Sequence, residues 1–304
     1  MQTLDDTYVV HRLWEAPDRA ALLAEHGSRI RGIATNGSVG AGAALLDQLP
    51  ALEIISCFGV GVDAIDLASA ARRGIAVTTT PGVLVEDVAD QALALLLAVS
   101  RNIVAADRHV REGKWAFAEL ALTRRVSGKK AGILGLGDIG KALAARLTAM
   151  RVSVSYCNRK AAEAPYRFVP DLEALASDSD FLVITASGGA STRNLVNARV
   201  LDALGPEGFL VNVARGSIID EPALLSALQN RKIAGAGLDV FWEEPHPSPT
   251  FFALDNVVLA PHAASGTVET RAAMGQLVVD NLAAHFAGKP LLTPYPNFSS
   301  QVAA

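Results

Sequence analysis

Residues 130–140 read Lys-Ala-Gly-Ile-Leu-Gly-Leu-Gly-Asp-Ile-Gly, which joins a short apolar strand to the start of a helix expected over 139–150. In a strand–turn–helix unit of this kind, Gly135 allows the tight turn, Gly137 lets a pyrophosphate approach the backbone, and Gly140 lets helix and strand pack closely. Free N–H groups at the helix N-terminus attract phosphate. The glycine spacing alone also fits a turn without a ligand, but in this context it predicts a dinucleotide-binding domain.

Apolar, β-rich runs alternate with amphipathic runs along the chain, and this alternation predicts parallel sheets covered by helices on both faces. After the glycine-rich turn, strands are expected at 152–157, 181–186, 209–213, 234–240 and 257–260, which makes six with the strand at 130–136. Before it, strands are expected at 8–10, 30–35, 52–58 and 75–79, and one continuous helix at 86–108. The other expected helices lie at 20–25, 41–48, 198–204, 222–230 and 268–287. The chain is therefore expected to hold a complete doubly wound, or Rossmann, domain and a second α/β domain.

Length and composition exclude several classes of protein. The chain has 304 residues, of which 50% are hydrophobic and 19% charged, enough for two domains with large cores. Its net charge is −4 and it has no basic block, so nucleic acid and anionic membranes are not expected partners. Two cysteines, Cys57 and Cys157, cannot form a disulfide framework or a zinc site, and no other metal site is expected. There is no signal-peptide pattern and no long apolar run, so a cytoplasmic location is expected.

The segment after the second strand of the nucleotide-binding unit bears on the choice of cofactor. Sites for NAD usually place an acidic residue there, about 20 residues after the glycines, to bind the ribose 2′-OH. Here the chain reads Asn158-Arg159-Lys160, and the first acidic residue is Glu163. Two cations suit a 2′-phosphate, which a carboxylate would repel. The segment therefore predicts a preference for NADPH, with NADH use left open. The alternative is a pair of ordinary solvated cations.

Three later segments each end an expected strand, at the edge where open parallel sheets bind ligands. The first, Ala214-Arg215-Gly216, places a cation where it suits bidentate binding of a carboxylate. The second covers residues 239–245 and reads Asp-Val-Phe-Trp-Glu-Glu-Pro, and the third is Pro261-His262. Each of them alone also fits a surface cation or a structural histidine.

The order of these motifs resembles the D-isomer-specific 2-hydroxyacid dehydrogenase family over nearly the whole chain. Residues 58–63, Phe-Gly-Val-Gly-Val-Asp, are similar to the substrate loop of that family, and Thr80-Pro81-Gly82 is similar to part of its interdomain segment. The segments 265–271 and 288–294 are most similar to the NADPH-dependent glyoxylate, hydroxypyruvate and hydroxyphenylpyruvate reductases.

The resemblance implies a reaction and a set of catalytic residues. NADPH would reduce a small 2-oxo acid, such as glyoxylate or hydroxypyruvate, to a D-2-hydroxy acid. Arg215 would hold the substrate carboxylate and polarise the keto group. His262 would donate a proton to the keto oxygen as general acid, and Glu244 would hydrogen-bond His262 and fix its tautomer.

The resemblance also implies binding residues. Backbone N–H groups at Val60 and Gly61 would bind the substrate carboxylate. The cofactor-binding set would comprise Gly135, Gly137, Asp138, Ile139 and Gly140 at the pyrophosphate, Asn158, Arg159 and Lys160 at the adenosine ribose, Ala214 beside the nicotinamide and Asp239 at the nicotinamide amide.

For the domains, the resemblance implies that a Rossmann domain, 98–287, is inserted into a flavodoxin-like substrate-binding domain made of 1–97 and 288–304. Substrate would sit in the cleft between them, and closure would exclude water from the hydride transfer. Members of the family are typically homodimers, so a homodimer is expected.

Two departures from the family pattern keep alternatives open. Residues 186–192 read Ala-Ser-Gly-Gly-Ala-Ser-Thr where many members carry a Pro-Leu-Thr-like segment, and Val85 stands where related reductases often have Thr. One alternative is a reductase of larger aryl 2-oxo acids such as phenylpyruvate. Another is a dinucleotide-responsive, corepressor-like binding protein that turns over slowly.

Overall fold

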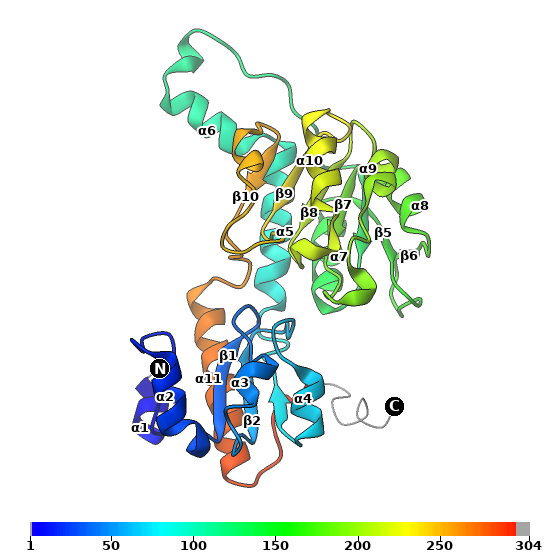
Figure 1. Ribbon diagram of the computed structural model, residues 1–304. Helices are drawn as coiled ribbons and strands as arrows, with labels where there is room; N and C mark the ends of the chain where they lie inside the picture. Colours follow the sequence, from blue (N-terminus) through cyan, green and yellow to red (C-terminus); the bar gives the residue numbers. More distant parts are fainter. Residues whose placement is uncertain (1, 296–304) are drawn as a thin grey trace. The chain divides into compact units, whose positions relative to one another are not determined.

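The structure, a computed structural model, describes residues 2–295, and the chain divides into two compact units (Figure 1). Unit 1 is made of the chain up to Leu84 and from Thr267 on, and unit 2 of Val85–Gly266. Both divisions lie earlier in the chain than the expected ones at 97/98 and 287/288, and residues 296–304 of the expected return lie outside the described residues. The difference arises from two long helices. Helix α5 (Val85–Ser100) packs on the sheet of unit 2, and helix α11 (Val268–Phe286) packs on the sheet of unit 1.

Unit 2 is built on one parallel sheet of seven strands in the order β10-β9-β8-β7-β4-β5-β6. The chain runs outward from β4 to β5 and β6, and then crosses to the other side of β4 with β7. This is the doubly wound order, with its switch point between β4 and β7. The expected α/β class with parallel sheets is confirmed. The strands are β4 (Lys130–Leu134), β5 (Ser153–Cys157), β6 (Arg167–Phe168), β7 (Phe181–Ile184), β8 (Phe209–Asn212), β9 (Gly235–Leu238) and β10 (Val257–Leu259).

Helices cover both faces of this sheet. On one face, α5 packs on β8 and β9, where Gly237 lets the helix approach: a Cβ there would lie 3.0 Å from the Leu95 Cβ atom. The remaining helices of the unit are α6 (Ile103–Arg111), α7 (Asp138–Ala149), α8 (Leu172–Ser177), α9 (Ala198–Leu204) and α10 (Glu221–Gln229), with short 3₁₀ turns η2 (Lys114–Ala116), η3 (Ala190–Thr192), η4 (Gly216–Ile218) and η5 (Pro249–Ala253).

The prediction of a single helix at 86–108 is wrong. Helix α5 ends at Ser100, and Asn102 adopts a left-handed conformation (φ 52°) that starts α6 at 60° to α5. The apolar spacing continues across the break, which is why the sequence pattern missed it. Among residues 2–295, no single helix is long and apolar enough to cross a membrane, and the bent pair of α5 and α6 reaches that length and composition only when both are taken together.

Unit 1 has three parallel strands in the order β1-β2-β3, namely β1 (Gly32–Asn36), β2 (Ile54–Phe58) and β3 (Ala76–Thr78). Helix α11 packs on β2, and its Leu282 shares a buried cluster with Ile54. The prediction of a strand at 8–10 is wrong. Tyr8 directly follows helix α1, and its ring packs on Phe286. The other helical segments are α1 (Gln2–Thr7), α2 (Arg19–His26), η1 (Gly27–Arg29), α3 (Ala43–Leu46) and α4 (Leu67–Arg72).

Candidate active site

The glycine-rich turn follows β4 and leads directly into α7. Gly135 has φ +100°, and a Cβ there would lie 2.5 Å from the Ala186 backbone. A Cβ on Gly140 would lie 2.4 Å from the Gly135 carbonyl oxygen, so both glycines are needed for the packing itself. Gly137 differs, because a Cβ there would meet nothing within 4 Å, and it caps α7 without a side-chain hydrogen bond. Open space and helix N–H groups without a side-chain cap are what a pyrophosphate requires.

The loop after β5 lies beside this turn. The Asn158 side-chain oxygen accepts the Leu136 N–H at 2.7 Å, which ties the loop to the glycine-rich turn. Arg159 and Lys160 follow, and both are exposed. The two sequence-predicted cations are therefore solvent-accessible beside the place where the phosphates of a dinucleotide would lie.

The loop after β8 carries Arg215 and is held by a residue that sequence reasoning missed. Asn212 is fully buried; its amide nitrogen donates to the Arg215 carbonyl oxygen at 2.9 Å, and its side-chain oxygen accepts the Ala214 N–H at 3.0 Å. These bonds fix the backbone of the Ala-Arg-Gly turn. The signal for Asn212 was visible, since it is a polar residue that ends an otherwise apolar, buried strand.

The loops after β8 and β9 lie in direct contact. A Cβ on Gly216 would lie 2.0 Å from the Phe241 carbonyl carbon, so only glycine allows this approach. The contact places the Arg215 segment beside the segment that carries Glu244. The positive charge of Arg215 is one of the influences that lower the pKa of Glu244, which also reflects this proximity.

His262 and Glu244 come together from neighbouring strands, β10 and β9. The His262 Nδ1 atom lies 2.6 Å from Glu244 Oε2, and the other carboxylate oxygen accepts the Phe241 N–H at 3.0 Å. Burial opposes the charged carboxylate, but the hydrogen bonds from His262 and Phe241 and the nearby positive charges outweigh it, so the pKa of Glu244 is lowered. An ionised Glu244 accepts a hydrogen bond from a protonated Nδ1, and Nε2 is the ring nitrogen that does not contact Glu244.

Asp239 follows β9 and has no exposed surface. Its two carboxylate oxygens accept the N–H groups of Ala263 at 2.9 Å and Ala264 at 3.0 Å. Burial raises the pKa of Asp239, although these two hydrogen bonds oppose the rise. The expected contact of Asp239 with a nicotinamide amide stays a prediction.

Val60 and Gly61 belong to unit 1, in the loop that follows β2. The loop is tied to Thr80, whose hydroxyl accepts the Gly59 N–H at 2.9 Å and whose own N–H donates to the Gly59 carbonyl oxygen at 2.8 Å. Val60 is 40% exposed. The backbone of Gly59, at the start of this loop, is thus held to Thr80, and the substrate role expected of Val60 and Gly61 stays a prediction.

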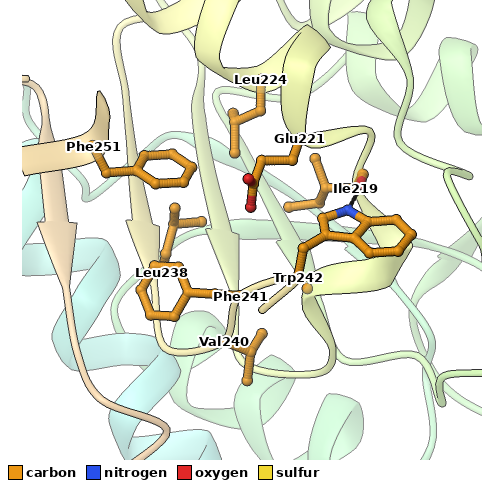
Figure 2. A pocket seen from close by; sticks show the side chains of 9 residues that line it. Ile219, Glu221, Leu224, Leu238, Val240, Phe241, Trp242 and Phe251 are labelled. Atoms are coloured by element: carbon orange, nitrogen blue, oxygen red, sulfur yellow. Dashed lines mark hydrogen bonds between the residues drawn. The ribbon is translucent and has the colours of Figure 1, made fainter. Parts of the chain in front are cut away.

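A small hollow between α10 and the loop after β9 contains none of the expected catalytic residues (Figure 2). Figure 2 shows the Trp242 indole donating to the Ile219 carbonyl oxygen, a bond of 2.7 Å. Burial raises the pKa of Glu221, although the hydrogen bond that its carboxylate accepts from the backbone N–H of Trp242 opposes the rise. The lining residues thus hold the segment that precedes Glu244 against the sheet.

Comparisons with known proteins show which family this chain resembles. Residues 93–264 match the family model of the D-isomer specific 2-hydroxyacid dehydrogenase NAD-binding domain. The chain is 48% identical to a hydroxyphenylpyruvate reductase of Plectranthus scutellarioides over 96% of its own length and 94% of that protein. It is 52% identical to a 2-ketogluconate reductase of Gluconobacter oxydans, over 87% and 86% of the two chains.

A solved structure is also similar throughout. It is an NADPH-dependent glyoxylate/hydroxypyruvate reductase of Sinorhizobium meliloti in complex with NADP and malonate, 44% identical, with a TM-score of 0.92 over 98% of this chain and 93% of that one. The family resemblance is confirmed. The chain belongs to the D-isomer-specific 2-hydroxyacid dehydrogenase family, whose NAD-binding domain model matches residues 93–264.

Proposed function

We propose that the protein reduces glyoxylate and hydroxypyruvate to D-2-hydroxy acids with NADPH. The observation that carries the proposal is the pair of His262 and Glu244, 2.6 Å apart, beside the Arg215 segment at the carboxyl edge of the sheet. Similarity to the NADPH-dependent glyoxylate/hydroxypyruvate reductase of Sinorhizobium meliloti supports the substrates and the cofactor.

In this proposal Arg215, His262 and Glu244 each have a separate role in the reaction. A bound nicotinamide cofactor would supply the hydride. Arg215 binds the carboxylate of the 2-oxo acid and polarises its keto group through charge-assisted hydrogen bonds. His262 donates its Nε2 proton to the keto oxygen, and Glu244 orients the ring through its hydrogen bond with Nδ1.

The cofactor would be held along the edge of the sheet in unit 2. Gly137 and the α7 N-terminus suit the pyrophosphate, because they offer open space and helix N–H groups without a side-chain cap. Exposed Arg159 and Lys160 suit a 2′-phosphate. The other residues proposed to hold the cofactor are Gly135, Asp138, Ile139, Gly140, Asn158 and Ala214, and Val60 and Gly61 are proposed to bind the substrate.

The test compares loss of reduced-cofactor absorbance with NADPH and NADH against glyoxylate, hydroxypyruvate and phenylpyruvate. Faster turnover of the two small acids with NADPH is expected. Preference for phenylpyruvate would favour the second candidate, an aryl 2-oxo acid reductase, which the similarity to a hydroxyphenylpyruvate reductase supports. Tight NADPH binding without turnover would favour the corepressor-like alternative.

We also propose a homodimer formed through an apolar arm, defined as α6 and the segment that follows it to residue 125. The arm extends away from the sheet of unit 2 (Figure 1). Trp115, Phe117 and Leu122 are 71%, 92% and 101% exposed on it, which is unusual for large apolar side chains and typical of an interface. Light scattering of wild-type protein should give a dimer, and Phe117→Asp should weaken it, whereas Val9→Asp, at an exposed site in unit 1, should not.

A cytoplasmic location is part of the same proposal. Cys57 and Cys157 are both buried cysteines, which suits a reducing compartment.

A further inference from the structure

The backbone of His262 has an unusual conformation. Its φ is +51°, in the left-handed region, which few residues other than glycine adopt because the side chain crowds the backbone. Such a conformation persists only where the surrounding structure holds it in place. Something must therefore hold the segment around His262.

That holding contact comes from Asp239. The backbone N–H groups of His262, Ala263 and Ala264 all donate to it: the first to the Asp239 carbonyl oxygen at 2.8 Å, the second to Oδ1 at 2.9 Å and the third to Oδ2 at 3.0 Å. The N–H of His262 also lies 3.1 Å from the Ala260 carbonyl oxygen. Residues 261–264 belong to no helix or strand, so these bonds replace regular secondary structure.

The chemistry of the contact requires a carboxylate. Successive N–H groups around a left-handed residue form a concave site for an anion. The occupant here is a side chain of the same chain, and it has no exposed surface. A carboxylate offers acceptors on both oxygens, whereas an amide of the same shape turns an NH₂ group toward one of the two N–H donors.

We propose that Asp239 is a positioning residue that acts through His262: its buried carboxylate fixes residues 262–264 so that the His262 imidazole meets Glu244. The role rests on the proposed function, because it matters to catalysis only if His262 is the general acid. It differs from a cofactor contact, which would affect NADPH binding first.

The first test is Asp239→Asn, with Asp180→Asn as its matched control. Asp180 precedes β7 at the opposite edge of the same sheet, and its carboxylate likewise accepts a backbone N–H, that of Lys130 at 2.9 Å. We expect Asp239→Asn to lower kcat with hydroxypyruvate at least tenfold while the Kd for NADPH stays within twofold. Asp180→Asn should leave kcat within twofold. Unchanged kcat in Asp239→Asn, or a loss that saturating NADPH restores, would overturn the proposal.

A second measurement needs neither turnover nor a folded variant. In wild-type protein with NADPH absent, hydrogen exchange followed by NMR should show slow exchange of the Ala263 and Ala264 amides, as for strand amides. Exchange as fast as that of an exposed loop would overturn the positioning role. Hydrogen exchange does not depend on the reaction. Slow exchange combined with no turnover of any 2-oxo acid would therefore contradict the proposed function but still support the Asp239 contact.

Discussion

The Nδ1 atom of His262 lies 2.6 Å from Oε2 of Glu244, although the two residues follow different strands of the sheet. The bond leaves the other ring nitrogen for a substrate, and the Phe241 N–H holds the far oxygen of the carboxylate. Because a parallel sheet brings the carboxyl ends of its strands to one edge, two residues from different strand ends form one hydrogen-bonded pair.

His262→Ala should therefore remove proton donation and little else. General acids contribute about 10²- to 10⁴-fold to rate, so kcat should fall by roughly that factor. The Kd for NADPH, measured by fluorescence, should stay near the wild-type value. If cofactor binding were lost along with turnover, His262 would be a structural residue and not the proton donor.

Arg215→Lys keeps the charge but loses the planar fork that binds a carboxylate through two bonds. Hydrogen bonds to charged groups contribute about 1.5–3 kcal/mol, so kcat/KM should fall about tenfold to a hundredfold. Steady-state kinetics with glyoxylate measures this. The control is Arg199→Lys, an exposed cation on α9 that pairs with Glu173. Equal effects of the two substitutions would remove Arg215 from the site.

The positions of the glycine-rich turn and of the strand ends could be predicted from the sequence better than the elements around them. The glycine-rich turn and the positions of Arg215, Glu244 and His262 at strand ends depend on local pattern and on the rule that parallel strands present one binding edge. The break at Asn102 could not be predicted, because apolar spacing continues through it. The two-residue strand β6 is too short to leave any pattern.

The hydrogen bonds of Asn212 and Asp239 could not be predicted from the sequence, for a different reason. Both are buried and act by accepting or donating backbone hydrogen bonds in loops with no regular structure. Which N–H groups a buried polar side chain meets is decided by tertiary packing. A sequence shows only that a polar residue stands in an apolar strand, as Asn212 does, or in a family motif, as Asp239 does.

Gly137→Ala separates binding from folding in the glycine-rich turn. Its φ is −84°, and a Cβ there would meet nothing in the protein, so thermal stability should be unchanged. The methyl group would stand in the space proposed for the pyrophosphate, so the Kd values for NADPH and NADH should both rise. Gly135→Ala is the contrasting control, since it should destabilise the fold itself through its contact with Ala186. Unchanged affinity in Gly137→Ala would place the phosphates elsewhere.

Replacing Arg159 and Lys160 together by Ala should weaken NADPH selectively. Loss of charge-assisted bonds to a 2′-phosphate, each contributing about 1.5–3 kcal/mol, should raise the Kd for NADPH tenfold or more. NADH has no 2′-phosphate, and its Kd should not change. Equal losses of affinity for the two cofactors would mean that the two cations do not bind the 2′-phosphate.

Glu244 should also make stability depend on pH in acid. Burial opposes its charge, but the bonds from His262 and Phe241 prevail, so its pKa in the folded protein lies below the ordinary value of 4.5. A lowered pKa adds stability that is complete above the unfolded-state pKa and is lost as pH falls through the folded-state value. The free energy of unfolding of wild type minus that of Glu244→Gln should therefore shrink as the pH falls below 4.5. Urea unfolding at a series of pH values measures this difference, with Glu243→Gln, its exposed neighbour, as the control for loss of one negative charge. A difference that grew as the pH fell would show that the Glu244 pKa is raised in the folded protein.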